Sequence, residues 1–159
     1  MACALIAEAA AWAKEQNKKL YDILLDIYVE FGFYKESLLN IVREGKSGAE
    51  EIQSMMASYR SNPPKTINGS KVVVIKDYKE QKSRDIITGK ETPIDQPKSD
   101  VLQFFTEDGS KISVRPSGTE PKIKFYFGVK EKLSCKEKFN EVNQAIDMKI
   151  KNIIASLQL

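Results

Sequence analysis

Histidine is absent from this 159-residue sequence, and its two cysteines, Cys3 and Cys135, lie far apart without a Cys-x-x-Cys spacing. These absences exclude His-based acid or base chemistry, Ser-His and Cys-His nucleophile pairs, and the usual zinc sites. We therefore expect no metal-binding or catalytic group of these kinds. Two unpaired thiols in a chain rich in lysine and glutamate are typical of a reducing cytosol, so we expect a cytoplasmic location.

Long apolar runs are missing as well. The apolar opening, residues 2–13, is interrupted by Glu8 and has no basic segment before it, so we expect neither a signal peptide nor a membrane span. It is instead predicted to be a buried helix. Because this helix has no N-cap residue or preceding turn, we interpret it as cut from a longer chain. A content of 42% hydrophobic and 30% charged residues indicates a globular protein.

Periodicity and turn residues predict the other elements. Helices are expected at 19–31, from Ser47 to just before Pro63, and at 134–157; strands are expected at 33–43, 71–75, 101–105, 111–114 and 123–129. The helices at Ser47 and Ser134 are each expected to open with a capping box. The polar segment 79–99 is expected to be a loop. This order predicts an α+β fold, with a mostly antiparallel sheet and helices covering one face.

The segment Arg115-Pro116-Ser117-Gly118-Thr119-Glu120-Pro121 lies between two predicted strands, and its residue types suit a phosphate site. Arg115 offers a planar fork of donors for two anion oxygens, and Ser117 and Thr119 add hydroxyls. Gly118 permits the positive φ of an anion-binding nest and a close approach to the main chain. A plain turn between strands remains the alternative, because Pro, Ser and Gly also build turns.

This heptapeptide, followed by Lys122-Ile123-Lys124-Phe125-Tyr126, resembles the phosphate-binding loop in the C-terminal domain of the α-D-phosphohexomutases, the phosphoglucomutase and phosphomannomutase family. The resemblance implies a four-stranded antiparallel sheet with two flanking helices, of the TATA-box-binding-protein-like type. The resemblance also implies a domain boundary after residue 32. Residues 1–32 are expected to be the helical tail of a preceding domain with a linker helix, and residues 33–159 the C-terminal phosphate-binding domain.

In the family that this chain resembles, four domains surround a cleft. The first carries a phosphoserine, the second an Asp-rich loop that holds Mg²⁺, and the third a loop that reads sugar hydroxyls. None of those three motifs occurs here. The resemblance implies that Arg115, Ser117, Gly118 and Thr119 bind the phosphate of a phosphosugar, that the other three domains are partners, and that the fragment alone is inactive. Which sugar is bound stays open among glucose, mannose, glucosamine and pentose.

Two other functions are weighed against this one. Basic and aromatic residues alternate from Lys122 to Phe127, which is loosely typical of a nucleic-acid-binding strand. Because Phe125 and Phe127 are expected to face the core, Tyr126 is left as a single exposed aromatic, and we expect no nucleic-acid partner. A stand-alone phosphosugar sensor is the other alternative, and the uncapped first helix argues against it.

Overall fold

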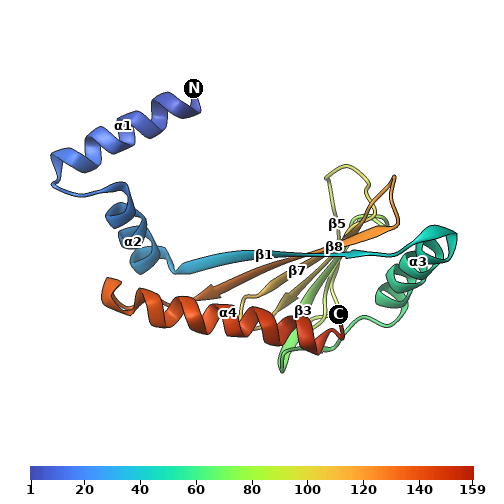
Figure 1. The fold of residues 1–159 in the computed structure, drawn as a ribbon. Coiled ribbons are helices and arrows are strands. Elements are labelled where there is room, and N and C mark those ends of the chain that lie inside the picture. The colour runs from blue at the N-terminus through green and yellow to red at the C-terminus, as the bar shows by residue number, and fades with distance from the viewer. The chain divides into compact units, whose positions relative to one another are not determined.

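The computed structural model describes residues 1–159, which form two compact units: residues 1–34 with 130–147, and residues 35–129 with 148–159 (Figure 1). The helices are α1 (Ala2–Glu15), α2 (Leu20–Phe31), α3 (Gly45–Ser61), the 3-10 turn η1 (Lys136–Lys138) and α4 (Phe139–Ser156). The strands are β1 (Phe33–Val42), β2 (Thr66–Ile67), β3 (Ser70–Asp77), β4 (Lys82–Asp85), β5 (Glu91–Pro93), β6 (Leu102–Thr106), β7 (Lys111–Pro116) and β8 (Lys122–Glu131).

Contacts between aromatic side chains, and one carboxylate that pairs with two lysines, hold the first unit together. Tyr28 of α2 lies 4.5 Å from Phe33, centroid to centroid, and Phe33 lies 5.1 Å from Phe139 at the start of α4. The carboxylate of Asp26 forms ion pairs with Lys136 and Lys18, and these contacts lower the pKa of Asp26. Helix α2 ends at Phe31 as predicted, since Gly32 adopts a φ of 98° that favours glycine.

The second unit contains the main sheet, whose strand order is β1-β8-β7-β6-β3-β4-β5, with β2 paired to β3. Every pairing among strands β2 to β8 is antiparallel. Tight turns fit the sequence: Asn68 and Gly69 both have positive φ between β2 and β3, and Gly109 has a φ of 80° between β6 and β7. The sheet therefore grows from short local connections, apart from the distant β1.

Strand alternation divides the sheet into an apolar face and a polar face. The apolar face is almost fully buried and consists of Leu102, Phe104, Ile112, Val114, Ile123, Phe125 and Phe127. Helix α3 packs on this face: Met56 is completely buried, and the Tyr59 ring lies 5.9 Å from that of Phe104. The end of α4 adds the buried Ile150 and Ile153. We call the opposite side, which carries Lys111, Ser113, Arg115, Lys124 and Tyr126, the polar face.

The predicted α+β class, with an antiparallel sheet and four helices, is confirmed. The sheet has eight strands, more than the four that the family resemblance implied. Part of the excess lies in residues 79–99, where the predicted loop contains the hairpin β4–β5. Arg84 and Lys82 of β4 both pair with Glu91 of β5, so charges across the strands rather than apolar alternation support this hairpin.

Both predicted capping boxes are wrong. Helix α3 begins at Gly45, two residues before Ser47, because Gly45 has a φ of 67° that turns the chain into the helix earlier. Helix α4 is preceded by a 3-10 turn whose N-cap residue is Cys135, which makes no side-chain capping bond. No helix has both the length and the apolar character required to cross a membrane.

Candidate phosphate-binding site

The predicted anion loop is a short connection between β7 and β8. Arg115 and Pro116 still belong to the ladder, where they are partners of Lys124 and Ile123. The Ser117 amide then closes the turn by donating to the Lys122 carbonyl at 2.6 Å. This amide is used by the fold, so it is not free for a ligand.

Three other amides remain available in the loop. The Gly118 N–H makes no hydrogen bond in the structure, while the N–H groups of Thr119 and Glu120 donate to the Ser117 hydroxyl oxygen at 3.4 and 3.3 Å. These distances are long for N–H···O bonds, whose usual value is about 2.9 to 3.0 Å, so the bonds are weak. An anion oxygen could therefore replace the hydroxyl as their acceptor.

Gly118 does not adopt the left-handed backbone conformation that glycine allows. Its φ is not positive, so the predicted nest built on a left-handed glycine is wrong. A Cβ placed on Gly118 would meet no atom within 4 Å. The absence of a side chain is thus not required by the fold, and it leaves the backbone open to whatever approaches the loop.

Arg115 is exposed on the polar face of β7, and its guanidinium makes neither a hydrogen bond nor an ion pair in the structure. Its ladder partner on β8 is Lys124, which lies on the same face. Two cations opposite each other in an antiparallel pair repel, and an anion between them removes this repulsion. The neighbouring Lys111 and Lys122 raise the local positive charge, and Glu120 opposes it.

The four predicted site residues line two different cavities. Ser117, Gly118 and Thr119 lie beside a cavity of about 270 Å³ that they share with the α3 residues Ala49, Ile52 and Gln53. Arg115 lines a second cavity of about 300 Å³ on the polar face. Arg115 is not among the residues of the loop cavity, so the structure places the guanidinium and the loop residues in two separate cavities.

Sequence reasoning missed several residues of these cavities. Gln53 of α3 comes from a distant segment, and no motif pointed to it. The polar-face cavity is also lined by Glu36, Ser37, Gln103, Lys111, Ser113, Tyr126 and Gly128. The alternation of residues 111–115, which places Lys111 and Ser113 on the same face as the predicted Arg115, was the signal that could have found two members of this set.

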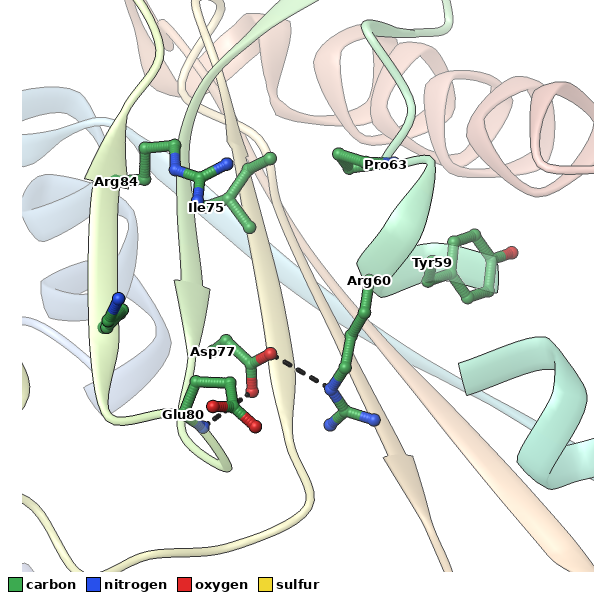
Figure 2. Close-up of a pocket in the computed structure, with 8 residues that line it drawn as sticks. Tyr59, Arg60, Pro63, Ile75, Asp77, Glu80 and Arg84 are labelled. Carbon is green, nitrogen blue, oxygen red and sulfur yellow. Dashed lines mark hydrogen bonds and ion pairs between the residues drawn. The ribbon is translucent and has the colours of Figure 1, made fainter. Parts of the chain in front are cut away.

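A further polar cavity, of about 240 Å³, holds an arginine that contrasts with Arg115 (Figure 2). The Arg60 guanidinium donates to Asp77 at 3.0 Å and also pairs with Asp100. Burial lowers the pKa of Arg60, but these two carboxylates outweigh it, so that the net pKa is raised. Arg60 is occupied by internal ion pairs and is not offered to a ligand.

No group of three or more Cys, Asp or Glu side chains is placed to hold a metal ion in residues 1–159. The Mg²⁺ that the family resemblance implies for a full-length enzyme does not fit any site formed by this chain. The groups that this chain offers to a ligand at the loop are hydrogen-bond donors and charged side chains.

Comparison with known proteins adds to this geometry. The family model described as phosphoglucomutase/phosphomannomutase, C-terminal domain, matches residues 38–146. A phosphoglucomutase of Staphylococcus aureus (strain MRSA252) is 38% identical over 146 residues, which are 92% of this chain and 25% of that protein. One from Staphylococcus saprophyticus is 38% identical over 130 residues, 81% of this chain and 22% of that protein. The chain thus spans about a quarter of the length of these relatives.

Among solved structures, the open form of the exocytosis-sensitive phosphoprotein pp63/parafusin of Paramecium, a phosphoglucomutase, is similar to this chain. It matches with a TM-score of 0.45 and 14% identity, over 87% of this chain and 24% of that one.

Proposed function

Because the chain belongs to the phosphoglucomutase/phosphomannomutase C-terminal domain family, we propose that it is the substrate-phosphate-binding domain of such a mutase. Arg115, Ser117, Gly118 and Thr119 hold the phosphate that does not react. The complete enzyme interconverts hexose 1-phosphate and 6-phosphate in the cytoplasm and uses Mg²⁺ held elsewhere. Residues 1–32 belong to a preceding domain and its linker helix, and residues 33–159 to the phosphate-binding domain.

The single observation that carries this proposal is the exposed, unpaired guanidinium of Arg115 beside a loop with three available amides. A guanidinium binds a phosphate through two parallel charge-assisted hydrogen bonds, which are about twice as strong as neutral ones. The Gly118 N–H and the hydroxyls of Ser117 and Thr119 supply further donors. Lys124 draws the anion toward the site and neutralises part of its charge.

Transfer of a phosphoryl group requires positioning and the neutralisation of developing charge. This chain contributes positioning, because it anchors one end of the substrate. The transfer itself is assigned to the other three domains, because the phosphoserine, Asp-rich and sugar-reading motifs of the family do not occur in this sequence. We expect no conversion of glucose 1-phosphate by this chain alone, with or without Mg²⁺, in a coupled assay.

The affinity of the detached domain is expected to be low. Each charge-assisted hydrogen bond contributes about 1.5 to 3 kcal/mol, and immobilising a ligand costs roughly 4 to 15 kcal/mol. The balance corresponds to a Kd of about 1 mM or weaker, near −4 kcal/mol.

The test is a titration of the ¹⁵N-labelled chain with glucose 6-phosphate, with unphosphorylated glucose as the control. Amide shifts at Gly118, Thr119 and Glu120 are expected with the phosphorylated sugar and not with glucose. An absence of shifts at tens of millimolar, roughly tenfold above the expected Kd, argues against the site.

A further inference from the structure

The polar-face cavity holds a second set of groups that the phosphate loop does not use. It measures about 300 Å³, at the lower end of the range for small-molecule sites. Its walls come from three neighbouring strands, β1, β8 and β7, and from the region around β6. Rigid strands hold side chains in more fixed positions than loops do, which suits a binding site.

The strand register arranges this cavity in three rows that begin at Arg115. Arg115 faces Lys124, Ser113 faces Tyr126, and Lys111 faces Gly128. Successive rows on one face are two residues apart, about 7 Å along the strand. The first row is cationic and the second carries two hydroxyl groups. A ligand that fits has an anionic group with hydroxyls a few bonds away.

Hydrogen bonds fix the second row. The Tyr78 hydroxyl donates to the Gln103 side-chain oxygen at 3.1 Å, and the Gln103 side-chain nitrogen donates to the Ser113 hydroxyl oxygen at 3.0 Å. Ser113 accepts in this chain of bonds, so its own O–H is left to donate. Gln103 retains a second N–H. The row thus presents donors held in place by Tyr78.

An apolar surface lies next to these donors. Tyr126 is 38% exposed, and its ring offers an apolar body with a polar tip. Gly128 has no side chain, and a Cβ there would meet Lys111 side-chain atoms at 3.7 and 3.8 Å. The aliphatic part of the Lys111 side chain therefore lies close to Gly128. Because Gly128 has no side chain, the cavity is deeper at this position.

We propose that the polar-face cavity binds the hydroxyl-bearing ring of a monosaccharide phosphate whose phosphate is held at Arg115. The Ser113 hydroxyl and the Gln103 amide donate to ring hydroxyls, the Glu36 carboxylate accepts from one, and the Tyr126 ring covers a C–H face. This inference rests on the proposed phosphate site, and it assigns to this domain a share of sugar recognition in addition to phosphate binding.

The test compares the Kd values of glucose 6-phosphate and inorganic phosphate in NMR titrations of the chain and its variants. Ser113→Ala removes a donor. Gly128→Val adds a side chain at the bottom of the cavity, at a position whose φ is not left-handed. Ser83→Ala is the matched control, because Ser83 lies on β4 outside the cavity.

The original chain is expected to bind glucose 6-phosphate about tenfold more tightly than inorganic phosphate. Ser113→Ala and Gly128→Val are each expected to reduce this preference to about threefold or less, with the Kd for inorganic phosphate unchanged within about twofold. Ser83→Ala is expected to keep the full preference.

The inference is overturned if the original chain shows no preference, or if both cavity variants keep it. In those two cases the phosphate site still stands, because inorganic phosphate binds. If neither ligand binds the original chain, the phosphate site and the sugar cavity are both wrong.

Discussion

Arg115 of β7 and Lys124 of β8 are direct partners in the antiparallel ladder, and both side chains project from the polar face of the sheet. No carboxylate pairs with either of them. Two like charges in this position destabilise the folded state, by an amount similar to that of other cross-strand pairs, about 0.2 to 1 kcal/mol. Such an arrangement is expected where the charges serve a ligand.

Lys124→Glu should therefore stabilise the fold and weaken the ligand site. The new carboxylate pairs with Arg115, so the free energy of unfolding in urea is expected to rise by about 0.5 kcal/mol. Phosphate affinity should fall, because the carboxylate competes for Arg115. Lys90→Glu is the control, since it makes the same charge change at an exposed position away from the site. A Lys124→Glu variant that binds phosphate as well as the original chain would show that Arg115 does not hold the anion.

Replacing two glycines near the loop by alanine should change stability at one of them and not at the other. A Cβ on Gly48 would lie 2.5 Å from the Arg43 Cβ and 2.9 Å from its carbonyl carbon, so Gly48→Ala forces α3 away from the chain before it. We expect a loss of about 1 to 3 kcal/mol in the free energy of unfolding. Gly118→Ala should leave stability within about 0.5 kcal/mol, as its surroundings are empty.

Phosphate titrations of the same two variants separate fold from function. Gly118→Ala is expected to weaken binding, because a methyl group obstructs the approach to the loop amides. Equal binding by Gly118→Ala and the original chain would mean that the anion does not approach the main chain at this residue.

Arg60 should matter for stability and not for binding. Arg60→Ala leaves the half-buried carboxylates of Asp77 and Asp100 without their cation, and partial solvent access moderates the cost. We expect urea denaturation to show a loss of about 2 to 3 kcal/mol. Arg84→Ala, which breaks a well exposed pair with Glu91, should cost at most about 1 kcal/mol. Similar losses in both variants would contradict the view that burial makes the Arg60 network important.

Asp108 should make the fold sensitive to acid. Burial raises the pKa of Asp108, but hydrogen bonds from Thr106, Lys149 and the Ser110 amide outweigh it and lower the pKa to about 2. The carboxylate therefore stabilises the folded state above the unfolded pKa of 3.8, and this contribution is lost as the pH falls from about 5 toward 2. After allowance for solvent screening it amounts to about 1 to 2 kcal/mol.

Urea denaturation at several pH values measures the contribution of the Asp108 carboxylate to stability. Asp108→Asn is expected to lower stability at pH 7 and to flatten the loss between pH 5 and pH 2. If the original chain and Asp108→Asn lose stability in parallel over that range, other carboxylates are responsible.

The sequence predicted the parts of the fold that depend on local patterns. Alternation from Ile123 to Val129 identified the buried face of β8, and Asn68-Gly69 identified the turn before β3. The β4–β5 hairpin was not found, because its strands are joined by ion pairs to Glu91 and show no apolar alternation. The two capping boxes failed because a left-handed Gly45 and a 3-10 turn at residue 136 moved the helix starts.

Only the contiguous part of the candidate site could be predicted from the sequence. The contiguous loop from Arg115 to Thr119 was evident from residue types, but its division between two cavities was not. Gln53, Glu36 and Gln103 reach these cavities from other elements, and a single sequence gives no register between distant strands. The conformation of Gly118 also depended on the closing bond from Ser117 to Lys122, which residue types do not reveal.

The central claim is that Arg115 and the loop after it bind phosphate, and the most direct measurement is a titration of the ¹⁵N-labelled chain and its Arg115→Ala variant with inorganic phosphate. The original chain should show saturable shifts at the Gly118, Thr119 and Glu120 amides with a Kd of about 10 mM, about tenfold weaker than for glucose 6-phosphate, and the loss of the guanidinium should weaken binding at least about tenfold. An unchanged Kd in Arg115→Ala, or no shift of these amides at tens of millimolar phosphate, would contradict the account.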